Sequence, residues 1–237
     1  MAEQVTIARR FRGPAESGNG GYSCGALARF VDPRSAEVTL RLPPPLDRPL
    51  AIETDGAERA MMRDGDALVA EAGPIGELNL ALPDPPSVDE AAAARDRSPM
   101  QHEHPFPNCF VCGPERKLGD GLQVTCGPVE GRQIVAAPWV VDESLPVEDG
   151  GVAPEIVWSA LDCPGGISAM LLPTVGTSVL GRLAARIYGR IEPGMCCVAV
   201  GWPIDRDGRK LHSGSAIFSA EGEPLAHAQA TWIELKR

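Results

Sequence analysis

The sequence has little positive charge for its length. Its 237 residues carry 22 Lys and Arg against 32 Asp and Glu, which gives a formal net charge of −10. Proteins that bind nucleic acids need clustered Lys and Arg side chains to neutralise the phosphates. The charge balance therefore argues against a nucleic-acid partner, while the basic segment at residues 182–190 remains suited to a small anionic ligand.

The chain also lacks a segment that would direct it to a membrane. Its first residues, MAEQVTIARRFRG, contain no apolar core followed by a small-residue cleavage site. Residues 163–181 are free of charge over a nominally membrane-spanning length, but two prolines and several glycines interrupt them. We predict a cytoplasmic protein with no membrane partner.

A disulfide framework and the common cofactor motifs are missing as well. The seven cysteines are odd in number and include the neighbours Cys196 and Cys197, a pattern typical of reduced intracellular thiols. Neither a P-loop nor a dinucleotide-binding fingerprint occurs in the sequence. We therefore predict no cofactor.

What is present suggests a duplicated α+β unit. Residues 73–99 are rich in proline and acidic side chains and read as a linker. On either side, a helix pattern is followed by strand-like segments with turn signals, which predicts an N-terminal unit at residues 1–72 and a C-terminal unit at residues 100–237. The expected helices lie near residues 20–31 and 154–170. The expected strands are residues 37–42, 49–54, 58–63, 66–71, 122–125, 133–140, 196–205, 210–220 and 224–235.

The second expected helix carries an acid among apolar residues. The stretch PEIVWSALDCPGG places Asp162 beside Ala160 and Leu161. Helical spacing puts Glu155, Ser159 and Asp162 on one polar stripe, since they lie at i, i+4 and i+7. A carboxylate in such surroundings needs a partner or a chemical function.

Three stretches resemble the hotdog-fold acyl-CoA thioesterases, in which an antiparallel sheet wraps a central helix. They are the helix start Asn19-Gly20-Gly21-Tyr22, the run NCFVCG at residues 108–113 ahead of DGL at residues 120–122, and residues 215–232. The resemblance touches both halves. It implies a double hotdog with two antiparallel sheets, each wrapped around a central helix.

The resemblance also implies where a site would lie. In this fold family, active sites form where two hotdog units meet, with helix amides of one unit facing an acid of the other. The Gly20 and Gly21 amides would then polarise an acyl thioester carbonyl, with Asp162 acting either as general base or as nucleophile. The expected catalytic residues are Asp162, Gly21 and Glu155, and the expected substrate-binding residues are Asn19, Gly20, Tyr22, Trp158, Ser159, Arg182 and Arg186.

Each of these assignments has a structural alternative. Asp162 could cap loop amides or pair with an arginine, and Asn19 could be an ordinary helix N-cap. Glu155 could simply favour the helix dipole from the first turn. The arginines at positions 182, 186 and 190 form a stripe if their segment is helical, which would either grip coenzyme A phosphates or face solvent.

A metal site is a further alternative. His102, His104, Cys109 and Cys112 supply enough ligands for tetrahedral zinc, but a single Cys-x-x-Cys without a second one is a weak signal. We predict no metal.

The leading functional hypothesis is a hydrolase for acyl-CoA or a related thioester. Its rival is a non-catalytic acyl-CoA or acyl-chain binding protein, favoured by Pro154-Glu155 standing where many such enzymes have His-Gly-Gly. Because free sheet edges can pair with another chain, we also expect a homodimer.

Overall fold

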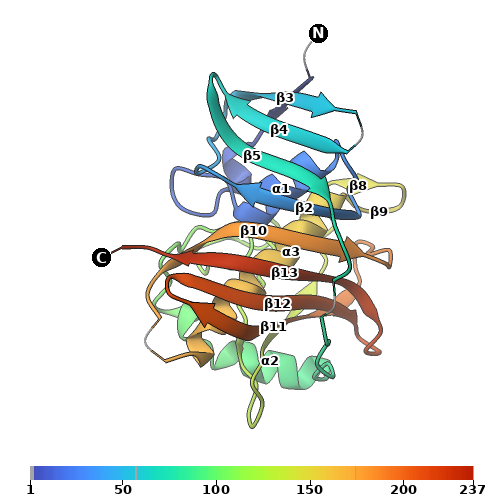
Figure 1. Cartoon of the computed structure of the whole chain (residues 1–237). Coiled ribbons are helices and arrows are strands. Elements are labelled where there is room, and N and C mark those ends of the chain that lie inside the picture. The colour runs from blue at the N-terminus through green and yellow to red at the C-terminus, as the bar shows by residue number, and fades with distance from the viewer. Residues whose placement is uncertain (1–2, 57, 79, 174, 237) are drawn as a thin grey trace.

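The computed structural model describes residues 3–56, 58–78, 80–173 and 175–236. Most of its strands belong to one antiparallel sheet, with the order β1-β3-β4-β5-β2-β10-β13-β12-β11-β7-β6 (Figure 1). A separate hairpin, β8 with β9, lies outside this sheet. The strands are β1 (Glu3–Thr6), β2 (Ser35–Leu40), β3 (Pro49–Asp55), β4 (Arg59–Asp64), β5 (Ala67–Pro74), β6 (Gly127–Pro128), β7 (Val135–Val140), β8 (Val147–Glu148), β9 (Gly151–Val152), β10 (Ser178–Ile187), β11 (Cys196–Asp207), β12 (Lys210–Ser219) and β13 (Pro224–Glu234).

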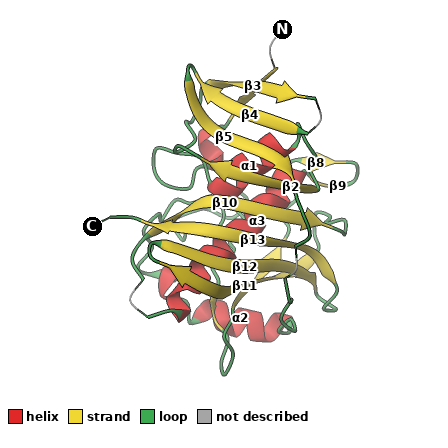
Figure 2. Cartoon of the chain, in the orientation of Figure 1, coloured by secondary structure: helices red, strands yellow, loops and turns green. Residues whose placement is uncertain are grey.

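Two helices lie side by side against the same face of the sheet (Figure 2). Helix α1 (Gly20–Ala28) packs against β2, β4 and β5, whereas α3 (Pro154–Ile167) packs against β10 to β13. The strands bury alternate side chains under these helices, as in β13, where Ala228, Ala230 and Trp232 belong to the main core. None of the helices in the described ranges combines the length and apolar character needed to cross a lipid bilayer.

The two sheets expected from the sequence are joined into one. Strand β2 of the first half pairs with β10 of the second, with Val38 opposite Leu183. The seam is therefore an ordinary antiparallel ladder, and each half still contributes one helix and several neighbouring strands. The division at residues 72 and 100 stays a prediction.

The segment predicted to be a linker is partly helical. Within residues 73–99, helix α2 (Val88–Asp96) begins with a capping box formed by Ser87 and Glu90. Its Ala91 and Ala94 pack with Val198 and other side chains of a second apolar cluster on the sheet face opposite α3. The short Ala-rich segment thus forms a helix whose buried side carries Ala91 and Ala94. Asn79 of this segment lies outside the described residues.

Three local expectations differ from the structure. The row of arginines considered for residues 182–190 required a helix, but the residues of this segment up to Ile187 belong to strand β10. Residues 122–125 are not a strand, and α1 ends at Ala28 rather than continuing to residue 31. The remaining expected strands occur with ends shifted by a few residues.

Candidate active site

The site forms where α1 and α3 touch, and glycine makes the contact close. A Cβ atom on Gly21 would lie 2.4 Å from the carbonyl oxygen of Trp158 and 2.6 Å from the Cβ of Asp162. Such distances do not occur between real side chains, so only glycine allows this approach. The absence of a side chain at Gly21 therefore lets the α1 backbone reach the Asp162 side chain.

Asp162 is buried and held through one of its two carboxylate oxygens. Its Oδ2 accepts hydrogen bonds from the Gly21 N–H at 2.9 Å and from Asn19 Nδ2 at 2.8 Å. Asn19 is also the N-cap of α1, because its Oδ1 accepts the Tyr22 N–H at 2.9 Å. This second bond fixes the orientation of the Asn19 amide and directs its NH₂ group at the carboxylate.

The other oxygen of the carboxylate, Asp162 Oδ1, is buried and has no hydrogen-bond partner among the described residues. Burial raises the pKa of Asp162 to about 7, and the neighbouring Cys109 adds to this shift. The hydrogen bonds from Gly21 and Asn19 act in the opposite direction. The site thus contains a buried carboxyl group that titrates near neutral pH and has one oxygen free.

Asp162 lines a cavity of about 1260 Å³. Asn19 and Gly20 line it beside the carboxylate, and an alkyl or aryl group would find mainly apolar walls farther away. The apolar lining residues include Leu40, Leu42, Met100, Phe106, Ile167, Met170, Leu172, Val175, Val179, Leu180, Trp232 and Ile233. A large apolar pocket with a few convergent polar groups is the usual form of a small-molecule site.

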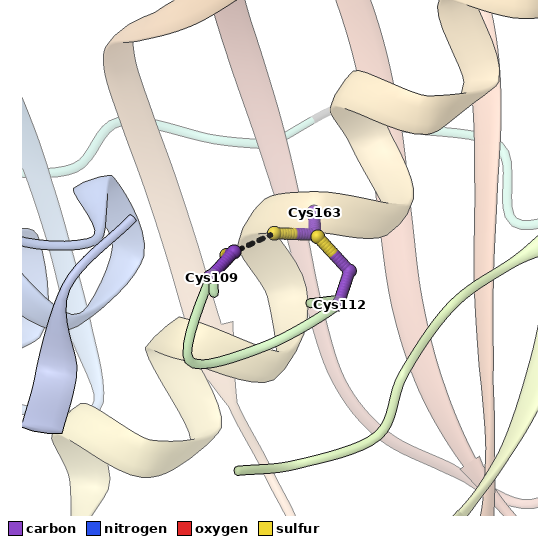
Figure 3. Close-up of side chains that lie close together, drawn as sticks. All are labelled: Cys109, Cys112 and Cys163. Atoms are coloured by element: carbon purple, nitrogen blue, oxygen red, sulfur yellow. Dashed lines mark hydrogen bonds between the residues drawn. The ribbon is translucent and has the colours of Figure 1, made fainter. Parts of the chain in front are cut away.

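Three cysteine thiols form a cluster (Figure 3). Asn19 Nδ2 connects this cluster to the carboxylate, since it contacts Cys109 Sγ and Cys163 Sγ as well as Asp162 Oδ2. The sulfur atoms of Cys109, Cys112 and Cys163 are all within 4.8 Å of one another, and all three residues line the cavity. Cys109 and Cys112 come from one loop, whereas Cys163 follows Asp162 on α3. This is the only group of metal-ligand side chains found in the described part of the chain. It differs from the four residues considered as zinc ligands in the sequence analysis, because it omits His102 and His104 and includes Cys163.

Several expected site residues lie elsewhere. Glu155 forms an ion pair with Arg29 at 2.9 Å, as an acid in a first turn readily does, and it does not line the cavity. Ser159 donates its hydroxyl to the Glu155 carbonyl at 2.7 Å, which is a bond within α3. The polar stripe on α3 therefore does not converge on one site.

The two aromatic residues expected to bind substrate are packing residues. The indole N–H of the buried Trp158 donates to the Pro33 carbonyl at 2.9 Å. Tyr22 stacks on Phe11 with ring centroids 3.9 Å apart, and burial raises the pKa of Tyr22 to about 12. Neither side chain lines the cavity.

Neither of the arginines expected to bind phosphate lines the cavity. Arg182 donates to Thr39 Oγ1 at 3.1 Å and pairs with Glu37 at 3.3 Å. Arg186 donates to the Gly76 carbonyl at 3.5 Å. Both lie on the face of β10 opposite to Leu183, which points into the core under the helices. Their neighbours are surface groups of the adjacent strand and linker.

Sequence reasoning brought together Asn19, Gly20, Gly21 and Asp162, and the structure places these four residues at one point. It missed Cys163 as a neighbour of Cys109, although Cys163 directly follows the acid in the sequence. Cys109 and Cys112 were considered as metal ligands only together with the nearby histidines. No local sequence pattern indicates that Cys163, 54 residues after Cys109, lies beside them.

Comparison with known proteins gives a match only at the level of structure. Neither a protein-family model nor a curated protein sequence matches the chain. A solved structure from Thermobifida fusca, described as a candidate thioesterase II, is 14% identical, with 98% of this chain and 92% of that chain covered and a TM-score of 0.63. A hot dog fold protein from Alicyclobacillus acidocaldarius is 10% identical, with coverages of 99% and 93% and a TM-score of 0.64.

A third solved structure, from Lactobacillus plantarum and described as a candidate oleoyl thioesterase, is 11% identical, covers 100% of this chain and 96% of that chain, and has a TM-score of 0.60. The near-complete coverage in all three cases means that the likeness extends over both halves. The chain therefore has the hot dog fold, as the sequence resemblance implied.

Proposed function

We propose that the protein hydrolyses an acyl thioester, with Asp162 as the general base. The observation that carries the proposal is the buried Oδ1 atom of Asp162, which has no partner among the described residues and belongs to a residue lining a large apolar cavity. A general base works best when its pKa lies near the operating pH, and about 7 meets that condition. Hot dog neighbours described as candidate thioesterases add fold-level support.

In the proposed reaction, a water molecule attacks the thioester carbonyl carbon through its oxygen atom. Asp162 Oδ1 removes a proton from this water molecule during the attack. The oxyanion that forms is stabilised by the Gly20 amide, because the first N–H groups of a helix have no partner within the helix. The tetrahedral intermediate then collapses, and the departing thiolate takes the proton from Asp162. This assigns the oxyanion role to Gly20 alone, since the Gly21 N–H is bonded to Asp162.

The acyl group would lie in the apolar part of the cavity. Its volume of about 1260 Å³ exceeds the usual range of pockets for drug-sized ligands, which favours a long or branched acyl chain over an acetyl group. We propose acyl-CoA as the substrate class, without the contribution from Arg182 and Arg186 expected earlier, because these side chains do not line the cavity.

The test is a panel of acyl-CoA substrates from acetyl to oleoyl, with benzoyl-CoA as an aromatic member. Free coenzyme A is quantified by chromatography, since the seven cysteines would react with a thiol reagent. Asp162→Asn should lower kcat by about two to four orders of magnitude, the usual contribution of a general base. Asp207→Asn, which removes an exposed carboxylate at a distant turn, is the matched control and should leave kcat unchanged.

Two results would contradict the proposal. One is wild-type turnover in Asp162→Asn. The other is saturable binding of an acyl-CoA with no hydrolysis of any member of the panel, which would instead support a non-catalytic acyl-CoA binding protein.

A further inference from the structure

We propose that Cys109 and Cys163 form a modification site, in which a hydroperoxide oxidises Cys109 and Cys163 then closes a disulfide beside Asp162. The inference does not depend on the proposed hydrolase activity, because it concerns the thiols alone. It rests on the positions of the sulfur atoms, on the N–H groups directed at them and on their access to the cavity.

The two sulfur atoms are already in contact. Cys109 Sγ and Cys163 Sγ are 3.7 Å apart, and a dashed line in Figure 3 joins these two side chains between the loop and α3. A disulfide bond is about 2.05 Å long, so the two atoms must approach by roughly 1.7 Å. Rotation of two side chains with small backbone shifts can supply such a movement.

Cys109 is the thiol that its surroundings favour as a thiolate. The neighbouring thiols of Cys112 and Cys163 donate to its sulfur, as do the backbone N–H groups of Cys112 and Val111, and together these bonds hold the pKa of Cys109 well below its usual range despite burial. Asn19 Nδ2 adds a contact at 3.8 Å. The thiolate is the form of cysteine that reacts with peroxides.

The loop that presents Cys109 is tightly built. Gly113 closes it with an N–H bond to the Cys109 carbonyl at 3.0 Å. A Cβ on Gly113 would lie 2.5 Å from the Cys109 nitrogen, so no other residue fits here without a shift. The sulfur of Cys109 is thereby held at the cavity wall, where a small peroxide that enters the cavity can reach it.

The same thiols do not complete a closed metal site with the described residues. A structural zinc ion needs four ligands, and the cluster supplies three. The imidazole nitrogen His104 Nε2 lies 3.2 Å from Cys112 Sγ. Because His104 Nδ1 accepts the Phe106 N–H at 2.9 Å, the neutral ring carries its proton on Nε2, which makes this atom a donor to sulfur and not a metal ligand.

The chemistry balances with a hydroperoxide as the oxidant. The Cys109 thiolate attacks one peroxide oxygen, the O–O bond breaks, and the leaving oxygen takes up a proton as water or an alcohol. The sulfenic acid so formed is attacked by the sulfur of Cys163, which forms the S–S bond and displaces hydroxide. That hydroxide takes the proton of the Cys163 thiol and leaves as water.

The disulfide would change the surroundings of the carboxylate. The Nδ2 atom of Asn19 lies 2.8 Å from Asp162 Oδ2 and also contacts Cys109 Sγ and Cys163 Sγ, at 3.8 Å and 4.0 Å. Movement of the two sulfurs therefore displaces the amide that orients Asp162. Cys163 also follows Asp162 directly in α3, so a pull on one residue is transmitted to the other.

The test uses the full-length, fully reduced protein, treated with a small molar excess of hydrogen peroxide and then alkylated. Mass spectrometry of the intact chain, alkylated after denaturation, should show two fewer alkyl groups than on the fully reduced protein, and peptide mapping should give a Cys109–Cys163 cross-link in most molecules. In Cys163→Ser the sulfenic acid of Cys109 has no thiol at position 163 to resolve it, and a dimedone adduct should appear there at a level several-fold above wild type. Cys196→Ser is the matched control and should cross-link as wild type does.

The proposal is overturned if wild type gives no cross-link, if Cys109 pairs mainly with Cys112, or if Cys163→Ser yields no adduct on Cys109. It is also overturned by stoichiometric zinc in the freshly isolated protein that is lost in Cys109→Ser, since the cluster would then be a metal site. The wild-type measurement decides even where a variant folds poorly.

Discussion

Replacing Asp162 by Asn should make the protein less active and, at alkaline pH, more stable. The side chain keeps its shape, but the ionised form that burial disfavours is no longer possible. In wild type, the pKa of Asp162 rises from 3.8 to about 7 on folding. Each pKa unit corresponds to roughly 1.36 kcal/mol, so a difference of about 3 units means that ionisation of the buried carboxyl group lowers the stability of the fold by about 4 kcal/mol.

The sign follows from proton binding. Between pH 3.8 and about 7 the folded chain keeps the Asp162 proton while the unfolded chain loses it, so wild-type stability falls as pH rises through this window. Above about pH 7 the Asp162 side chain is ionised in the folded chain as well, and the full cost of burying this charge lowers the stability of wild type. The amide that replaces the carboxyl group in Asp162→Asn does not titrate. As pH rises through the same window, the stability of the variant should therefore increase relative to that of wild type.

The substitution also has a cost. The new amide side chain can still accept from Gly21 and Asn19 through its oxygen, but its NH₂ group takes the position of Oδ1, where no partner exists among the described residues. An unsatisfied buried donor costs about 1 to 3 kcal/mol. Relative to wild type, the free energy of unfolding of Asp162→Asn should be higher by about 2 kcal/mol near pH 8 and lower by about 1 to 3 kcal/mol near pH 4.

Urea unfolding of wild type and variant at several pH values, under reducing conditions, measures this difference. The thiols of Cys24, Cys109 and Cys112 interact electrostatically with Asp162, so the series is repeated in a Cys109→Ser background to separate their titration. Asp207→Asn is the exposed control and should show no trend of this size. A variant that is less stable than wild type by the same amount at every pH would refute the reasoning.

Three further outcomes are expected. Gly25→Ala should lower the free energy of unfolding by about 1 to 2 kcal/mol in denaturant titrations, because its Cβ would lie 2.6 Å from the Cα of Glu155 and the overpacking exceeds the gain in helix propensity. The double variant Arg182→Ala and Arg186→Ala should change KM for acyl-CoA by no more than about twofold, and a rise of about tenfold would reinstate a phosphate-binding role. Met170→Trp should reduce kcat/KM for long acyl chains relative to short ones by about tenfold, because Met170 lines the cavity, and an unchanged ratio would remove that part of the cavity from acyl binding.

The meeting of α1 and α3 could be predicted because its signals are local. Asn19 with two following glycines marks a helix start, and Asp162 within an apolar helix marks a carboxylate that has to be satisfied. The fold family implied by these motifs then placed the two helix regions together. The particular bond between the Gly21 N–H and the carboxylate was not foreseen, since the sequence does not reveal how closely the helices approach.

The expectation of a possible helix at residues 182–190, where the structure has strand β10, was wrong for a physical reason. Arg182 and Arg186 are four residues apart, and that spacing puts side chains on one side of a helix and equally on one face of a strand. The alternation of Leu183, Ala185 and Ile187 with outward residues is the feature that distinguishes the strand. The ion pair of Glu155 could not be foreseen for another reason, because its partner Arg29 lies at the end of the neighbouring helix, 126 residues away.

Helix α2 limits how two copies of the chain could assemble. With α3 on one side and α2 on the other, the strands around β11 are covered on both faces, so face-to-face association there would first have to displace α2. The outer surface near β4 carries ion pairs such as Arg63 with Glu53. If the predicted homodimer forms, strand addition at the outer edge of β1 is one possible route, and it would produce an elongated particle that small-angle scattering distinguishes from a compact one.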